Sequence, residues 1–578
     1  MNLTFQLLRD ETLGKNYMFH TPYGERVLTY ADYTASGKSL KFIEKYLLEI
    51  QKCYANTHTE DDMTGAVMTN ILHKSEKIIK KQLNADKNCF IIPSGTGATG
   101  AIESFAKIAG IYIPPATKIR MNEIIKKISN QSMDLNTFLK NADEKFKEDI
   151  PVVFIGPYEH HSNILIWRES IAEVVEIELN NEGTLDLEDL EAKVSSDRYK
   201  NRLKIGSFSA ASNVTGVVTP VYKVAEILHN YGASACFDFA ASGPYVEINM
   251  NIDEKSYFDA VYFSPHKFIG GPGSAGILVV NSKIYDKSIP PTVSGGGTVS
   301  YVSSFAHDYL DNVEEREKAG TPGILQVVKA ALAIELKNKV GIDNIIRKER
   351  EYTDKVMNRL NKNEKIEILG PTDPDKRISI ISLMIKHKDK YLHPRFLAKL
   401  FNDLFGIQTR AGCACAGPYG HRLLNIDNER SGIFRNIIHD GCSALKPGWL
   451  RFNLHYVMIE EEIDFICDAI EFAAEYGYLF LSDYVVDIKS GDWFHKDFDY
   501  SYEIVNNFGV LESMNYVEKD VLSTNDMNSK EKFEEYLSMA KELANTLINN
   551  LDNNYFTLDE AFYKNQSWFY YKNSINNI

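Results

Sequence analysis

Lys267 stands where a short apolar run meets a glycine-rich turn. The segment DAVYFSPHKFIGGPGSAGIL (259–278) places Ser264, Pro265, His266 and Lys267 directly after the apolar residues. A lysine at a strand end, among small residues, is desolvated, which disfavours its charged form and makes the amine a nucleophile for an aldehyde. On this segment alone, a surface lysine beside a tight turn is the alternative.

Three other polar residues follow or adjoin apolar runs upstream. Asp238 ends the run in ACFDFAAS, where its carboxylate can pair with a protonated pyridine nitrogen or cap a helix. Asn213 lies in SNVTG (212–216), and His160 is the first histidine of EHHSN (159–163). Adjacent histidines form either a polar loop or half of a metal site. No further ligand stands at a convincing spacing, so we predict no metal.

The stretch PSGTGATG (93–100) contains a GxGxxG pattern at Gly95, Gly97 and Gly100. This pattern is the fingerprint of dinucleotide-binding loops, but glycines before a helix N-terminus bind any phosphate. A Rossmann unit usually opens its domain, whereas this motif comes well inside the chain. We therefore favour the phosphate of another cofactor over a nicotinamide. A second glycine cluster, SGGGT (294–298), is typical by itself of a flexible loop.

A cysteine pair occurs in IQTRAGCACAGPYGH (407–421). A thiolate nucleophile needs exposure, which a loop bounded by glycines provides. Arg410 offers a planar fork for a substrate carboxylate. Cys413 and Cys415 could also be a redox couple or bind a metal, but a tetrahedral zinc needs two more ligands that the sequence does not supply.

Alternating strands and helices must position these residues. Short apolar runs at 88–93, 151–156, 203–210, 234–240, 260–264 and 276–280 predict buried strands of a parallel or mixed sheet. Segments such as PVYKVAEILHNYG (220–232) have helical spacing and end in glycine. The pattern predicts a large α/β domain at 30–295, interrupted by a lysine-rich helical insertion at 113–150.

The rest of the chain predicts a smaller α+β domain over 296–480, with residues 1–29 as its N-terminal segment. It begins with one long helix at 322–345. Residues 481–578 form a C-terminal extension of unknown role, with a helix predicted at 529–552.

Composition narrows the class of protein. The 578 residues, 44% hydrophobic and 25% charged, are typical of a globular protein, and the net charge of -15 argues against nucleic-acid binding. We find neither a signal peptide nor an apolar run of membrane-spanning length, so we expect no membrane partner and a cytoplasmic location. The seven cysteines are few for this length and odd in number, which predicts no structural disulfides.

Together these motifs, in this order, resemble the class V aminotransferase family of pyridoxal 5'-phosphate (PLP) enzymes, and within it the SufS-like branch of cysteine desulfurases and selenocysteine lyases. The resemblance covers roughly residues 28–470. It implies the type I fold of PLP-dependent transferases, in which a large α/β domain has a mixed, mostly parallel sheet. It also implies a homodimer.

The resemblance implies roles for individual residues. In SPHK, Lys267 would hold PLP as a Schiff base, with Ser264 and His266 at the phosphate. Asp238 would pair with the pyridinium, and His160 would stack on the ring and relay protons. The remaining cofactor contacts would be Gly97, Ala98, Thr99, Asn213 and, from the partner subunit's loop, Thr298. The substrate would be bound by Arg410 and Asn213, and by His58 in YANTH (54–58).

The loop RAGCAC resembles the RxGxxC loop of this branch, which makes Cys415 the sulfur acceptor. Cys413 remains an alternative nucleophile, because molybdenum-cofactor sulfurases also carry a cysteine pair here. The resemblance implies release of sulfur from L-cysteine, or a close analogue, as an enzyme persulfide with alanine as product. A C–S lyase or aminotransferase acting on another amino acid, and a sulfur-transfer scaffold that binds a sulfur-acceptor protein, are the alternatives. Lys318 departs from the pattern, since relatives tend to have glutamate there.

Overall fold

The computed structural model of the protein describes residues 3–57, 59–129, 135, 137, 148–412, 415–516, 529–549 and 568–575. The chain forms two compact units, one of residues 36–346 and one of residues 1–35 together with 347–578. Residues 296–346 therefore group with the region of Lys267, whereas the sequence analysis places them in the smaller domain. Each unit is described by itself below.

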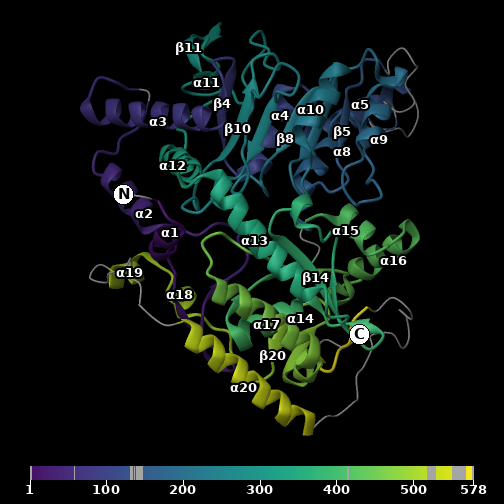
Figure 1. Cartoon of the computed structure of the whole chain (residues 1–578). Coiled ribbons are helices and arrows are strands. Elements are labelled where there is room, and N and C mark those ends of the chain that lie inside the picture. The colour runs from purple at the N-terminus through teal and green to yellow at the C-terminus, as the bar shows by residue number, and fades with distance from the viewer. Residues whose placement is uncertain are drawn as a thin grey trace. The chain divides into compact units, whose positions relative to one another are not determined.

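The unit of residues 36–346 is built on a seven-stranded sheet (Figure 1). The strands lie in the order β4, β10, β9, β8, β7, β5, β6; β10 is antiparallel to both its neighbours, and the last five are parallel. They are β4 (Cys89–Ser94), β5 (Val152–Ile155), β6 (Glu173–Glu176), β7 (Lys204–Ser209), β8 (Ser234–Asp238), β9 (Ala260–Phe263) and β10 (Gly276–Asn281). All six apolar runs of the sequence are strands of this sheet, so the predicted mixed, mostly parallel sheet is confirmed.

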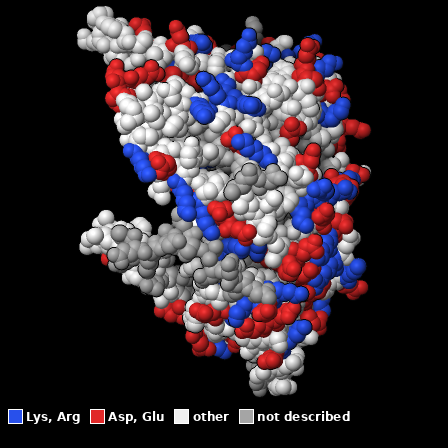
Figure 2. Space-filling model, turned by 60° about the vertical axis from the view of Figure 1, so that its left-hand side comes forward, with Lys and Arg blue, Asp and Glu red and all other residues white. Residues whose placement is uncertain are grey.

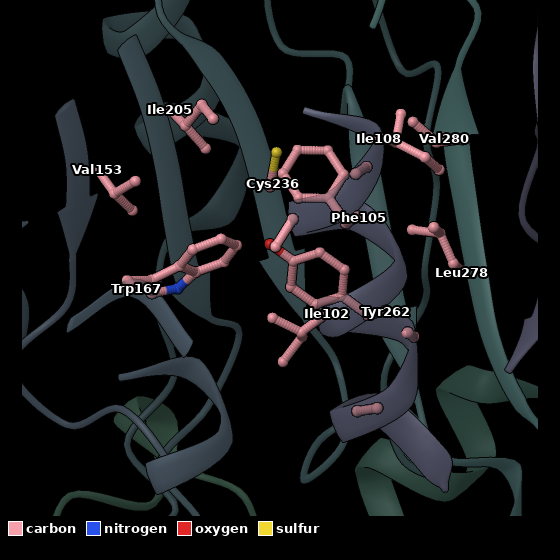
Figure 3. Close-up of a cluster of buried hydrophobic side chains, with 14 of the residues drawn as sticks. Ile102, Phe105, Ile108, Val153, Trp167, Ile205, Cys236, Tyr262, Leu278 and Val280 are labelled. Atoms are coloured by element: carbon pink, nitrogen blue, oxygen red, sulfur yellow. The ribbon is translucent and has the colours of Figure 1, made fainter. Parts of the chain in front are cut away.

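Helix α4 (Gly97–Ile108) packs against this sheet. Figure 3 shows Phe105 of this helix next to Tyr262 of β9, and their ring centres are 5.9 Å apart. The Trp167 ring lies edge-on to Phe105 at 6.4 Å. All three side chains are buried, and aromatic rings in such tilted or edge-on contacts stabilise a core beyond their buried area. This packing fixes the N-terminus of α4 relative to the strand ends.

The predicted helix over 322–345 is wrong in one respect, because the structure has two helices there. Helix α12 (Ile324–Val340) ends at Gly341, and α13 (Ile342–Leu360) begins at the next residue. Gly341 has a φ of 96°, which lies in the left-handed region that favours glycine and ends a helical ladder. The apolar periodicity continues past this glycine and does not reveal the break.

The unit of residues 1–35 and 347–578 contains a five-stranded antiparallel sheet. Strands β13, β14, β18 and β17 lie in that order, and β15 pairs with β14. Their bounds are β13 (Ile366–Ile368), β14 (Ile380–His387), β15 (Lys390–Tyr391), β17 (Arg410–Gly412) and β18 (Trp449–Asn453). This sheet carries the predicted arginine–cysteine loop at the end of β17.

The residues after 480 are part of the fold of this unit. Strands β19 (Tyr484–Asp487), β20 (Trp493–His495) and β21 (Ser574–Ile575) form a three-stranded sheet. Helix α20 (Ser529–Asn549), yellow in Figure 1, packs on α17 (Glu460–Tyr476), where Phe533 and Phe465 stack at 4.1 Å. The helix predicted at 529–552 is confirmed over the described residues.

The predicted insertion at 113–150 contains helix α5 (Pro115–Ser129), and most of its remainder lies outside the described residues. On the face shown in Figure 2, basic and acidic side chains of the described residues are interspersed rather than gathered by sign. No helix among the described residues is long and apolar enough to cross a membrane.

Candidate active site

The carboxyl ends of four parallel strands gather the predicted cofactor residues at one edge of the seven-stranded sheet. Strand β8 ends in Asp238, and β9 is followed by the short helix η3 (Pro265–Lys267). The loop after β5 carries His160, and the turn after β7 carries Asn213. Ligands of open parallel sheets bind at this edge. The structure therefore brings together residues that lie more than a hundred positions apart in the chain.

Asp238 and Lys267 form the charged pair of this edge. Asp238 is 4% exposed. Burial raises the pKa of Asp238 to about 6, although the Ala240 N–H, 2.8 Å from Oδ1, and the positive charge of Lys267 both oppose this rise. A buried carboxylate with incomplete compensation is stabilised by a further cation, and a protonated pyridine nitrogen is such a group.

The start of α4 forms a cradle for an anion. Thr96 makes no side-chain cap, and the Ala98 N–H donates instead to Ser264 Oγ at 2.8 Å. Gly97 has a φ of 61°, and a Cβ there would lie 2.7 Å from Ser264 Oγ. Thr99 Oγ1 and Ser162 Oγ are 2.7 Å apart. N–H groups at a helix start, with hydroxyls around them, suit a phosphate.

Two further observations distinguish this cradle from a dinucleotide site. Strand β4, which precedes the glycines, is an edge strand, and its neighbour β10 is antiparallel to it. A Rossmann fingerprint instead follows a strand inside a parallel βαβ unit. His266 also adjoins the cradle; burial lowers its pKa, and Lys267 lowers it further.

His160 is held by a short helix, η1 (His161–Asn163), that it caps. The Ser162 N–H donates to His160 Nδ1 at 3.2 Å, which leaves the proton of the neutral ring on Nε2. The sequence analysis missed the residue before it, Glu159, which is 1% exposed. Its carboxylate accepts from Ser209 N at 2.8 Å and from Asn163 Nδ2 at 2.6 Å, and burial raises its pKa to about 7. Glu159 therefore ties the turn of His160 to the end of β7.

Two other predicted site residues, Asn213 and Thr298, lie among the described residues, whereas His58 and Cys413 do not. Asn213 is 7% exposed in a turn where Ser212 Oγ accepts from Val214 N at 3.1 Å. Thr298 Oγ1 donates to Gly295 O of its own loop at 2.7 Å, so its reach towards a partner subunit stays a prediction.

The other compact unit holds the predicted carboxylate and sulfur residues. Arg410 of β17 lies opposite Arg451 of β18, a residue that the sequence analysis missed. Asp32 bonds both: its Oδ2 accepts from Arg410 Nε at 3.0 Å and its Oδ1 from Arg451 Nη2 at 2.9 Å. The Arg410 side chain is 50% exposed, so the fork of its guanidinium stays accessible to a substrate carboxylate. An arginine inside the apolar run WLRFNL was the available signal for Arg451.

Cys415 follows this strand on an exposed turn. Its φ is 55°, a left-handed conformation that a non-glycine residue adopts at an energetic cost. Among the cysteines that the structure describes, Cys415 is the exposed one, whereas Cys89, Cys236, Cys442 and Cys467 are buried. The structure thus presents this thiol to solvent on the turn that follows the strand of Arg410, and exposure is one requirement of a nucleophilic cysteine.

Comparison with known proteins shows which family this chain belongs to. Residues 118–466, more than half of the chain, match the family Aminotransferase class-V. The chain belongs to this family. The chain is 32% identical over 298 residues to a probable cysteine desulfurase of Pyrococcus abyssi, and the aligned region covers 51% of this chain and 70% of that protein. It is 30% identical over 300 residues to a probable cysteine desulfurase of Halalkalibacterium halodurans, covering 51% and 69%.

Solved structures agree on the fold. The apo cysteine desulfurase from Thermococcus onnurineus superposes with a TM-score of 0.59 at 24% identity, over 78% of this chain and 95% of that one. The cysteine desulfurase CsdA from Escherichia coli gives 0.56 at 19% identity, over 77% and 94%. The predicted type I fold is confirmed, and this class V aminotransferase belongs to the cysteine desulfurase branch and is a PLP-dependent enzyme.

The site fits this cofactor. Its phosphate suits the cradle at the start of α4, its pyridine nitrogen suits the buried Asp238, and its aldehyde suits Lys267. The individual site residues stay predictions.

Lys318, a departure from the family pattern, has its own partners in the structure. Lys318 is 4% exposed, and its Nζ lies 2.7 Å from Glu76 and 2.9 Å from Glu315. Burial opposes its charge, but the two carboxylates more than offset this and raise the pKa of Lys318. Among the described residues, Glu76, Glu315 and His73 form a group with the spacing of metal ligands. Because Lys318 binds both carboxylates, the group is explained as an ion-pair cluster.

Proposed function

We propose that this class V aminotransferase is a cysteine desulfurase, which takes the sulfur of L-cysteine onto Cys415 as a persulfide and releases alanine. The observation that carries the proposal is the exposed Cys415 at the end of the strand that begins with Arg410, in a chain that belongs to the cysteine desulfurase branch. Cys413 stays the alternative acceptor.

The carboxylate of the amino acid binds to Arg410. The Nε of this arginine donates to Asp32, and its two terminal nitrogens are the donors with which a guanidinium binds a carboxylate in a bidentate manner. Arg451 supplies a second positive charge on the neighbouring strand. Recognition of a free carboxylate fits a single amino acid rather than a residue inside a peptide.

Proton transfer is the task of residues at the carboxyl ends of the parallel strands. Bound PLP supplies the electron sink for the reaction. Lys267 Nζ takes the α-proton of the substrate, and His160 relays protons through Nε2, the ring nitrogen that does not accept from the Ser162 N–H. Asp238 holds its negative charge opposite the cofactor's ring nitrogen.

Sulfur transfer is a displacement by a thiolate. The Cys415 Sγ attacks the sulfur of the substrate, and a new S–S bond forms while the C–S bond of cysteine breaks. The electron pair of the broken bond stays on the β-carbon, which takes up a proton. Lys267 returns the α-proton, and the product leaves as alanine. A thiol reductant or an acceptor protein then removes the persulfide sulfur from Cys415.

The wider setting of the enzyme follows the family. We propose a homodimer in which Thr298 contacts the PLP phosphate of the partner subunit. A sulfur-acceptor protein and a cytoplasmic location belong to the same proposal. Thr298→Ala should then weaken PLP retention, and a monomer with full PLP occupancy would contradict the dimer.

The deciding experiment measures alanine and sulfide released from L-cysteine in the presence of a reductant. Wild type is compared with Cys415→Ala, Cys413→Ala and a control, Cys53→Ala, which removes a half-buried cysteine. We expect equal alanine and sulfide from wild type and the control, and neither from Cys415→Ala. Activity in Cys415→Ala that is lost in Cys413→Ala would make Cys413 the acceptor, whereas turnover retained in both variants would favour a C–S lyase or an aminotransferase. An inert wild type that still captures an acceptor protein would favour a scaffold.

A further inference from the structure

We propose that the part of the C-terminal extension around β19 and β20 holds the Arg410 strand in position for substrate, through a hydrogen-bonded chain of three residues, Asp403, Asn402 and Gln408. We call these residues the Asp403 chain. The inference rests on the proposed function, since it takes Arg410 as the carboxylate-binding residue. It assigns a role in substrate binding to Tyr484 and Tyr500 of the extension, which lie beyond residues 118–466, the part of the chain that matches the family.

The chain begins at a buried carboxylate. Asp403 is fully buried in the short π-helix η5 (Phe401–Phe405), a rare element that is frequent at functional sites. Its Oδ2 accepts from the hydroxyls of Tyr484 at 3.0 Å and Tyr500 at 2.6 Å, and both tyrosines belong to the extension. Lys399 Nζ lies 3.8 Å from Oδ1 and 3.2 Å from the centre of the Tyr500 ring.

Each of these contacts offsets the cost of burying the charge. A buried carboxylate that loses its hydrogen-bond donors must move, take up water or change its protonation. Two of the donors to Asp403 come from the extension, so the position of the π-helix depends on residues more than eighty positions further along the chain.

The Asp403 chain then continues through Asn402 to Gln408, in the strand that precedes the strand of Arg410. Asn402 Nδ2 donates to Asp403 Oδ1 at 2.6 Å, and Gln408 Nε2 donates to Asn402 Oδ1 at 2.7 Å. Gln408 lies two residues before Arg410, in strand β16 (Ile407–Gln408). A displacement of Asp403 is therefore transmitted by side-chain bonds as well as by the backbone.

The backbone between the π-helix and Arg410 has little freedom to absorb such a displacement. Gly406 has a φ of 75°, and a Cβ there would lie 2.3 Å from Val27 O. Its carbonyl accepts from Thr29 N at 3.0 Å, and Gln408 O accepts from Ala31 N at 3.0 Å. Ala31 precedes Asp32, the partner of Arg410, so the Asp403 chain ends next to both members of that ion pair.

The experiment removes the two hydroxyls and keeps the rings. The double variant Tyr484→Phe/Tyr500→Phe is compared, as PLP-loaded enzyme, with wild type and with Tyr571→Phe. Tyr571 is a matched control, because it lies in the extension, is fully buried and donates its hydroxyl to Ala444 O at 2.7 Å. The readouts are KM and kcat for L-cysteine, PLP absorbance, and hydrogen exchange of the amides of residues 406–412.

We expect the KM of the double variant to rise about three- to tenfold, the effect of one or two lost buried hydrogen bonds, with kcat and PLP absorbance near wild type. The amides of 406–412 should exchange faster in this variant alone. An unchanged KM, or an equal rise in Tyr571→Phe, would overturn the proposal. If the double variant does not fold, Gln408→Ala decides the matter, since it cuts the Asp403 chain without touching the extension and should raise KM in the same way.

Different results would overturn the proposed function and the inference about the extension. If wild type does not turn over L-cysteine, the proposed function is wrong, and the hydrogen exchange of 406–412 still tests the link to the extension. If wild type turns over L-cysteine and the double variant keeps its KM and its exchange rates, the proposed function stands and the inference about the extension is wrong.

Discussion

Arg410 and Arg451 face each other directly across the neighbouring antiparallel strands β17 and β18. Like charges in this position repel each other, yet Asp32 accepts a hydrogen bond from each. One carboxylate therefore holds two guanidinium groups in place, and a net positive charge remains for a substrate carboxylate. Cys415 follows the same strand, so under the proposed function this ion cluster would link the recognition of the amino acid with the acceptance of its sulfur.

Asp32→Asn should weaken both stability and substrate binding. The change removes the negative charge that pairs with the buried Arg451, so we expect the free energy of unfolding to fall by about 1–3 kcal/mol. We also expect KM for L-cysteine to rise about tenfold, the equivalent of ~1.4 kcal/mol. Urea unfolding and steady-state kinetics measure the two effects. As a control, Asp375→Asn removes an ion pair with Arg350 in which both side chains are exposed, and it should change stability by less than about 1 kcal/mol.

Gly97→Ala should weaken PLP binding. The positive φ of Gly97 is strained for alanine by about 1–2 kcal/mol, and the new methyl group would displace Ser264 Oγ from the cradle. PLP titration followed by absorbance, together with thermal unfolding, measures the effect. Gly432→Ala is the matched control: Gly432 lies in helix α16 (Asn428–His439) with open space around it, so alanine should leave PLP affinity unchanged and stability equal or higher. Normal PLP affinity in Gly97→Ala would contradict the placement of the phosphate.

Alanine substitutions of the two adjacent histidines, His160 and His161, should differ sharply in their effect on kcat. His160→Ala removes the ring whose orientation is fixed by the Ser162 N–H, and we expect kcat to fall by about 10²- to 10⁴-fold, as for the loss of a general acid–base group. His161→Ala should stay within a few-fold of wild type. Both variants should keep PLP, which its absorbance will show. Equal losses in the two variants would mean that the turn as a whole, and not the His160 ring, is required.

A buried glutamate gives a prediction about pH and stability. Burial raises the pKa of Glu349 to about 8, although Ser379 Oγ and the Tyr456 N–H donate to it. The folded protein thus holds a proton that the unfolded chain has released above its ordinary pKa of 4.5, so this group makes stability fall as pH rises through that window.

Glu349→Gln should remove this dependence. From about pH 5 to about pH 8, the free energy of unfolding of the variant should improve relative to wild type, by up to about 1.4 kcal/mol per pH unit. Glu351→Gln, an exposed neighbour on the same helix, is the control and should follow wild type. A difference between Glu349→Gln and wild type that does not vary with pH would contradict the assignment.

Much of the cofactor edge could be predicted from the sequence, because its residues follow apolar runs. Lys267, Asp238 and His160 each come just after a strand-forming segment, and parallel strands must bring their carboxyl ends to one edge. The glycine pattern at Gly95 to Gly100 was ambiguous by itself. The antiparallel neighbour of β4 supports the PLP interpretation, and strand order is information that a linear motif does not carry.

The remaining features depend on contacts between residues far apart in the chain. Asp32 and Arg451 are separated by 419 positions, and no periodicity relates them. The contacts of the extension could not be predicted either. Its aromatic residues are visible in the sequence, but the contact of Tyr484 and Tyr500 with Asp403 depends on tertiary packing. Glu159 was missed because a glutamate before two histidines looks like part of a solvated loop. Its carboxylate is instead buried and accepts hydrogen bonds from three residues, Gly156, Ser209 and Asn163.

The most direct test of the central claim is to locate the sulfur after reaction. The PLP-loaded enzyme is given L-cysteine without a reductant, its thiols and persulfides are alkylated, and its peptides are analysed by mass spectrometry. The account predicts one extra sulfur atom on Cys415, an equal amount of alanine, and no persulfide elsewhere. Alanine formed without a persulfide on Cys415, or a persulfide found on Cys413 instead, would contradict it.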